Sequence, residues 1–71
     1  MNAFNPRKLK LSKWTARHPE NREKHFLVTD LELDEEGHVL RVELEAVHSK
    51  RSQWLDWRVL RDPEVWLMGW Q

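Results

Sequence analysis

The chain has 71 residues, which is the size of one small domain. Twelve lysines and arginines balance twelve aspartates and glutamates, so the chain lacks the net positive charge of a protein that coats nucleic acid. Cysteine is absent, which excludes a disulfide framework, a cysteine-ligated zinc site and thiol redox chemistry. Five tryptophans and two phenylalanines are the unusual part of the composition, and we expect burial of most of these rings to drive folding.

Charge is segregated along the chain although the total is zero. Residues 1–25 carry seven basic and two acidic side chains, residues 26–49 one basic and seven acidic, and residues 50–71 four basic and three acidic. Either the basic first segment pairs with the acidic middle segment across a sheet, or the two ends of this dipole face different partners. The chain shows neither a long apolar run nor the apolar core of a signal peptide, so we expect a cytoplasmic protein.

The first quarter of the chain predicts an arm followed by a strand. Residues 1–8, which include Asn5 and Pro6, predict a flexible or loosely attached arm, and residues 9–71 predict a single domain. Alternation over residues 9–17 predicts a first strand. Residues 18–22 predict a turn, because Pro19 disfavours helical backbone at the residue before it and lacks an amide donor.

Residues 25–33 and 39–47 predict the two arms of a hairpin around residues 34–38, where Gly37 supplies the left-handed backbone. The second arm places alternate apolar residues on one face, as a half-solvated strand requires. The first arm changes phase, since Phe26 and Val28 lie on one face while Leu31 lies on the other. An extra residue near positions 29–30 would restore the phase, so we expect either a β-bulge there or a strand covered on both faces.

The C-terminal part predicts a further strand and a short helix. Residues 52–60 alternate, with Trp54 on the face opposite Trp57. Asp62, Pro63 and Glu64 favour a helix start, so a helix is predicted through residues 65–68, ending at Gly69. Two turns are marginal alone, so this helix must dock, with Trp66 and Trp70 as the docking side chains.

Together these elements predict a mainly β fold of the α+β type. We expect a small curled antiparallel sheet of about four strands, with the short C-terminal helix packed on a tryptophan-rich core. The predicted core residues are Trp14, Phe26, Val28, Leu40, Val42, Leu44, Trp57, Trp66 and Trp70.

Several separated sequence blocks carry a family resemblance. They include residues 12–16 (Ser-Lys-Trp-Thr-Ala), 23–29 around His25 and Phe26, 44–51, and 57–70 with Trp57, Trp66 and Trp70. Together these blocks resemble a family of small tryptophan-rich bacterial proteins of about this length, whose function is unknown. The resemblance covers roughly residues 11–70 and implies a bacterial origin and a free-standing domain. It supplies no catalytic residue, cofactor or substrate.

No pattern in the chain predicts catalysis or a metal site. The histidines are spaced by 7, 13 and 10 residues, whereas compact metal motifs place two ligands within about five residues. Ser49 and His48 are neighbours on an extended chain, so their side chains point to opposite faces and do not pair readily. Neither a nucleophile elbow nor a glycine-rich phosphate loop occurs. We therefore expect a protein without enzymatic activity, metal or cofactor.

A binding surface is the stronger functional hypothesis. Tryptophan and arginine are enriched at protein-binding hot spots, and bases of single-stranded nucleic acid stack on aromatic side chains. Trp54 can lie either in the core or in solvent because its strand neighbours are charged, and Arg58 could cover it by a cation–π contact. The candidate binding residues are Trp54, Arg58, Lys50, Arg51, Lys13 and Arg17.

The sequence therefore predicts a small non-catalytic binding module. Protein–protein association, as an adaptor or as a homodimer, requires only one exposed aromatic patch or strand edge. The alternative is weak binding of single-stranded nucleic acid or nucleotides, since zero net charge allows few phosphate contacts. No membrane partner is expected.

Overall fold

The computed structural model describes residues 1–71 and contains one antiparallel sheet of five strands, without an α-helix. The strands, in chain order, are β1 (Lys13–Glu20), β2 (Glu23–Leu33), β3 (Val39–Ala46), β4 (Ser52–Asp56) and β5 (Trp66–Met68). Their order across the sheet is β4-β3-β2-β1-β5. The mainly β class is confirmed, with one strand more than predicted. No helix of the fold has the length and apolar composition that crossing a bilayer requires.

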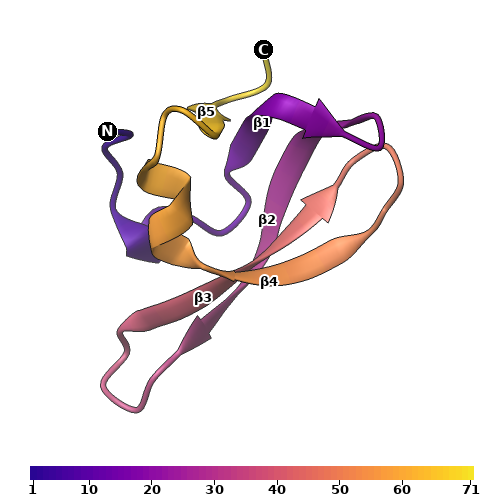
Figure 1. Ribbon diagram of the computed structural model, residues 1–71. Coiled ribbons are helices and arrows are strands. Elements are labelled where there is room, and N and C mark those ends of the chain that lie inside the picture. Colours follow the sequence, from indigo (N-terminus) through magenta and orange to yellow (C-terminus); the bar gives the residue numbers. More distant parts are fainter.

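The sheet curls, and its two ends differ (Figure 1). At one end the β2–β3 hairpin projects beyond the other strands, while at the other end the β1–β2 turn lies beside the loop between β3 and β4. Two 3-10 turns, η1 (Pro6–Lys8) and η2 (Trp57–Arg61), lie next to each other at one side of the curl. The curl therefore has one covered face, which holds the core.

A β-bulge in β2 places apolar residues from both halves of the strand on the covered face. Val28 pairs with Leu44 and Leu31 pairs with Val42, while the register shifts between Val28 and Asp30. Because side chains alternate along a strand, Leu31 would face away from the core without this extra residue. The predicted bulge is confirmed, and so is the hairpin turn, in which Gly37 has a φ of +84°.

Ten buried apolar side chains form the core: Leu9, Trp14, Phe26, Val28, Val39, Val42, Leu44, Ala46, Leu60 and Trp66. Six of the nine predicted core residues are among them, and Trp57 packs against the cluster with partial exposure. The core thus contains two of the five tryptophans, Trp14 and Trp66, as buried rings.

Leu40 and Trp70 were wrongly predicted as core residues, and each has a local cause. Leu40 is 45% exposed because it has no pairing partner in β2: Glu32 pairs with Arg41, and the next pair is Leu33 with Val39. Trp70 is 44% exposed, because the chain that carries it is not helical and its ring lies beside His25 and Lys13, on the face opposite the core.

The predicted C-terminal helix is also wrong. Asp62 begins a turn as its type favours, since its carboxylate accepts from the Glu64 N–H and its carbonyl accepts from the Trp66 N–H, both at 2.9 Å. That turn does not propagate, because Trp66–Met68 pair with β1 as β5. An available strand edge and an aromatic, β-favouring sequence outweigh two turns of marginal helix.

Three other boundaries differ from the prediction. β1 begins at Lys13 rather than at residue 9, because Leu11 has a positive φ of 68° and breaks the extended chain. The turn predicted at residues 18–22 shrinks to residues 21–22, which both have positive φ, as tight hairpin turns do. β4 ends at Asp56, whose carboxylate accepts from the Arg58 N–H and starts η2.

Residues 1–8, the predicted arm, make specific contacts with the body of the protein. The Asn2 side-chain amide donates to the carbonyls of Leu60 and Trp66, both at 2.9 Å. The Phe4 ring lies edge-on to Trp14, with ring centroids 5.5 Å apart, and packs against the core. Asn2 therefore joins the N-terminal segment to both η2 and β5.

We expect Asn2→Ala to lower the free energy of unfolding by about 1–3 kcal/mol, because two partly buried carbonyls lose their donor. In a domain of this size the midpoint of thermal unfolding should fall by about 4–8 °C per kcal/mol, measured by tryptophan fluorescence. Lys8→Ala, at an exposed position of the same segment, should leave the midpoint unchanged. An unchanged midpoint for Asn2→Ala would show that the segment is detached in solution.

Candidate functional site

The face of the sheet opposite the core, called here the open face, carries two exposed tryptophans. Strand alternation assigns to it Lys13, His25, Leu27, Glu43, Glu45 and Trp54, with Trp70 lying over its β1 side. The open face is therefore a mixed, largely charged surface with one ring near each margin.

Trp70 attaches the C-terminal residues to the open face. Its indole N–H donates to the Phe26 carbonyl at 3.0 Å, and its ring lies 5.8 Å from the His25 ring. The Lys13 ammonium lies 4.8 Å from the same ring. These contacts give Trp70 a structural role, although 44% of its surface remains exposed.

Trp54 is 40% exposed on β4, and its cation partner is not the predicted one. The Arg41 guanidinium lies 5.5 Å from the Trp54 ring, whereas Arg58 donates to Asp56 at 3.0 and 2.6 Å. The prediction assumed that β4 continues to Arg58, but the strand ends at Asp56. Arg41 is placed instead by the register of β3 against β4.

The six predicted binding residues do not gather into one patch. Lys13 and Trp54 lie on the open face, but β2 and β3 separate their strands. Lys50 is exposed in the loop before β4, where its φ is +64°, and Arg17 is exposed on β1. Arg51, in contrast, forms part of a defined cleft.

β4 has a free edge. It pairs only with β3, and the Ala46 N–H donates to the Arg51 carbonyl at 2.8 Å just before the strand begins. Bonding to a given neighbour alternates along an antiparallel ladder. The backbone N–H and C=O groups of Ser52 and Trp54 and the N–H of Asp56 therefore point toward the unpaired side, whereas the Asp56 carbonyl starts η2. Trp54 thus combines an exposed ring with unpaired backbone groups.

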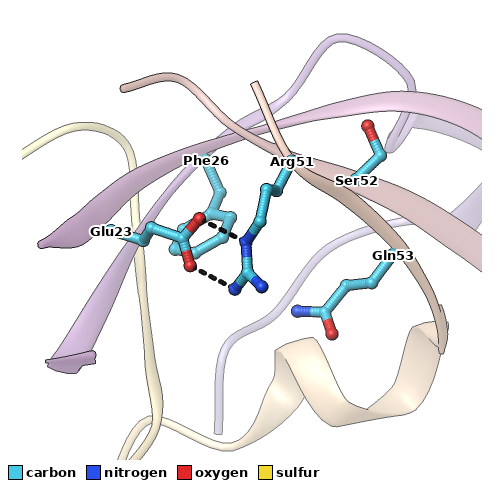
Figure 2. A pocket seen from close by; sticks show the side chains of 5 residues that line it. All are labelled: Glu23, Phe26, Arg51, Ser52 and Gln53. Carbon is cyan, nitrogen blue, oxygen red and sulfur yellow. Dashed lines mark hydrogen bonds and ion pairs between the residues drawn. The ribbon is translucent and has the colours of Figure 1, made fainter. Parts of the chain in front are cut away.

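A cleft, the second candidate surface, opens on the covered face between β4 and the β1–β5 side of the curl. It consists of two adjoining hollows of about 200 and 280 Å³. Phe26, Trp66 and Val65 supply its apolar lining, and its polar lining includes Glu20, Glu23, Arg51 and Gln53. Figure 2 shows the side chains of Arg51 and Gln53 directed toward the same space.

The Glu23–Arg51 pair forms the wall of this cleft. Arg51 Nε and Nη2 donate to the two carboxylate oxygens of Glu23 at 2.9 and 2.7 Å, and the Ser49 hydroxyl donates to the same carboxylate. Glu23 is only 6% exposed, whereas the Arg51 side chain is 69% exposed. Hydrogen bonds from Arg51 and Ser49 lower the pKa of Glu23 from 4.5 to about 2.

The Glu23 carboxylate is a weak proton acceptor because its pKa is so low, so its bond to Ser49 does not activate the hydroxyl. The structure brings together no group of three or more histidine, aspartate or glutamate side chains that could hold a metal ion. The cleft can offer hydrogen bonds from Arg51 and Gln53, charge, and aromatic contact with Phe26 and Trp66.

Sequence reasoning missed Glu23, Arg41 and Gln53. Glu23 becomes buried only when the loop between β3 and β4 reaches the β1–β2 turn, a contact without a local signal. Arg41 and Gln53 lie in strands that were predicted, but their neighbours depend on the β3–β4 register, which the loop sequence does not specify.

We expect acid to destabilise the protein partly through Glu23. Its folded pKa lies below its ordinary value, so its contribution is complete above about pH 4.5 and is lost as the pH falls through about 2. Glu23→Gln should therefore flatten the decline of the unfolding midpoint over this range. Asp56→Asn is the comparison, because Arg58 also lowers the pKa of Asp56 to about 2 but at a more exposed position. An equally steep decline in Glu23→Gln would contradict the pairing with Arg51.

Comparison with known proteins identifies one relationship. A family model described as Tryptophan-rich protein (DUF2389), a domain of unknown function, matches residues 12–71. No curated protein and no solved structure matches the chain.

Proposed function

We propose that this chain, which belongs to the tryptophan-rich family of unknown function, is a non-catalytic protein-association module that pairs with a second copy of itself through β4. The observation that carries the proposal is the coincidence of a free strand edge and an exposed Trp54 ring on the same five residues. The proposal includes the bacterial cytoplasm as the setting, where the cysteine-free chain would associate without disulfides.

The edge of β4 lacks the features that usually prevent pairing. Native proteins protect an edge strand with lysine, proline, a bulge or a covering segment. β4 reads Ser-Gln-Trp-Leu-Asp, contains neither lysine nor proline, and pairs with β3 in continuous register. Its one charged residue, Asp56, is paired with Arg58 of the same chain.

A two-fold axis at Trp54 would use the free backbone groups at the centre of this edge. In that antiparallel register Trp54 lies opposite the partner's Trp54, and Ser52 lies opposite the partner's Asp56. The two Trp54 residues then exchange both backbone hydrogen bonds, and the Ser52 carbonyl accepts from the partner's Asp56 N–H, whereas the Asp56 carbonyl belongs to η2. The two indole rings become cross-strand neighbours on the open face, where aromatic pairs are stabilising.

The charges of the two ends support the same arrangement. Residues 30–38, which include the tip of the β2–β3 hairpin, carry five carboxylates and no lysine or arginine. The opposite end, residues 20–24 and 50–51, carries four basic and two acidic side chains, with Arg51 paired to Glu23. Within one chain, Asp56 is the end of β4 nearer the acidic hairpin tip, and Ser52 is the end nearer the basic residues. Two β4 strands that pair antiparallel therefore place the acidic end of one chain beside the basic end of the other. Association through this edge should therefore weaken as salt is added.

Weak binding of single-stranded nucleic acid or nucleotides is the alternative, and one observation favours it: Arg41 lies beside the exposed Trp54 ring. Arg41, however, donates to the Glu32 carboxylate twice at 2.8 Å, and Glu43 pairs with Trp54 across the strands. A phosphate near the ring would meet these carboxylates, so protein association is the better-supported proposal.

We expect the protein to sediment as a dimer at high concentration, and Trp54→Lys to raise the dissociation constant about thirtyfold or more. The variant removes an interface aromatic and places two like charges opposite each other. Ser52→Pro should have the same effect, because it removes an outward N–H without removing a β3 bond. Leu40→Lys is the control: Leu40 is 45% exposed but lies outside β4. A monomer at all concentrations, or a dimer lost equally in Leu40→Lys, would contradict pairing through β4.

The register is testable because the chain has no cysteine. Gln53 and Leu55 bond to β3, so across the proposed axis Gln53 faces the partner's Leu55 in the close, non-hydrogen-bonded pair that suits a disulfide. A mixture of Gln53→Cys and Leu55→Cys chains should form mixed disulfides under mild oxidation. Gln53→Cys chains alone should form few disulfides, because residue 53 of one chain lies two residues away from residue 53 of its partner in this register.

An oligonucleotide titration separates the alternative from the proposal. We expect a short oligo(dT) at low salt to leave the Trp54 indole resonance unshifted in nitrogen–proton spectra, because carboxylates flank the ring. A saturable shift at Trp54 that disappears in Arg41→Gln and decreases steeply with salt would favour nucleic-acid binding instead.

A further inference from the structure

We infer that the cleft binds a carboxylate attached to an apolar group, presented either by a small carboxylic acid or by the C-terminal residue of a peptide. The site is complete in one chain and lies on the covered face of the curl, whereas Trp54 projects from the open face. The inference therefore goes beyond the proposed function and does not depend on dimer formation.

Arg51 is held in a fixed orientation with one side still available. Its Nε and Nη2 atoms bond to Glu23, a nearly enclosed carboxylate that is itself held by Ser49. No protein group bonds to Nη1, so the Nη1–Nη2 edge presents two parallel donors. This edge of a guanidinium matches the two oxygens of a carboxylate. The Glu23 bond thus preorganises Arg51 for a second anion.

Gln53 and the aromatic lining complete the site. Figure 2 shows the Gln53 carboxamide beside the guanidinium, on the side away from Glu23, where its N–H₂ group can donate to the same ligand. Phe26 and Trp66 lie edge to face, with ring centroids 5.1 Å apart, and line the adjoining hollow. A hollow of about 280 Å³ accommodates one small apolar group, such as a phenyl ring.

The charges of the cleft favour a monoanion. Glu20 and Glu23 line it together with Arg51. These two carboxylates would repel a phosphate with two negative charges more strongly than a carboxylate with one. The two segments around the cleft, residues 17–24 and 47–53, carry five basic and two acidic side chains, which favours an anion over a cation. A carboxylate on an apolar body fits both observations.

The test is a nitrogen–proton NMR titration with phenylacetate and with its neutral isostere phenylacetamide. We expect phenylacetate to bind in the millimolar range, with saturable shifts of the Arg51 Nε–H and of the backbone amides of residues 52 and 53. Phenylacetamide should cause at most weak, non-saturating shifts, since it offers no anion to the guanidinium. Inorganic phosphate should bind more weakly than phenylacetate.

Two variants assign the binding to named groups. Arg51→Lys retains a cation for Glu23 but lacks the second donor edge, so the dissociation constant should rise about tenfold or more. Gln53→Ala changes an exposed side chain outside the ion pair and should weaken binding by roughly twofold to tenfold, which keeps the test valid if Arg51→Lys folds poorly. Arg58→Lys is the matched control, because Arg58 is also an exposed arginine paired with one carboxylate, and it should have no effect.

A peptide arm identifies the source of the carboxylate. Acetyl-Gly-Gly-Phe with a free C-terminus and the same peptide as its amide replace the small ligands. Tighter binding of the free-acid peptide than of phenylacetate indicates a chain terminus, and weaker binding indicates a small acid. Equal binding of acid and amide, undiminished binding in both Arg51→Lys and Gln53→Ala, or no saturable shift up to the solubility limit of phenylacetate would overturn the inference.

Discussion

A strand alternates its side chains between two faces, and β2 keeps Phe26, Val28 and Leu31 on one face only by admitting one extra residue between Val28 and Asp30. With that bulge, Phe26 and Val28 from one half and Leu31 from the other all reach the same core. The sheet therefore has a single apolar face, which η2 and the N-terminal segment help to cover, while the opposite face stays open. Both candidate surfaces follow from this asymmetry: the cleft is the uncovered end of the apolar face, and Trp54 lies on the open face.

The tryptophans divide according to these faces. Trp14 and Trp66 are enclosed, Trp57 is half-buried beside Phe4, and Trp54 and Trp70 keep about two fifths of their surface exposed on opposite margins of the open face. Most rings thus build the fold, and no three of them lie in solvent together. The two exposed rings are not equivalent, because the Trp70 N–H is bonded to a backbone carbonyl, whereas Trp54 lies in the strand with the free edge. The exposure of Trp54 therefore has no structural explanation comparable to the hydrogen bond of Trp70.

The features predicted correctly from sequence are local ones. The hairpin and its bulge follow from Gly37 and from the change of phase in one short segment. The errors arise where a distant partner decides the outcome. Asp62 starts a turn as expected, but β1 offers an edge to the following residues and converts a predicted helix into β5. The Glu23–Arg51 pair likewise joins two turns that are separated by a whole hairpin, so no periodicity or composition of either segment could indicate it.

Charge segregation connects the fold to the proposed self-association. The only ion pair between the basic first segment and the acidic middle segment is Lys10–Asp30, at 3.8 Å and largely exposed, so folding leaves the dipole in place. Two copies carry no net charge and do not repel each other as whole bodies, yet their opposite ends attract. A head-to-tail arrangement would satisfy one end at a time and continue into a filament, because each added copy exposes a new end. The proposed two-fold axis at Trp54 would satisfy both ends at once and pair the β4 edges with each other, so it is the closed arrangement that these charges and this edge favour.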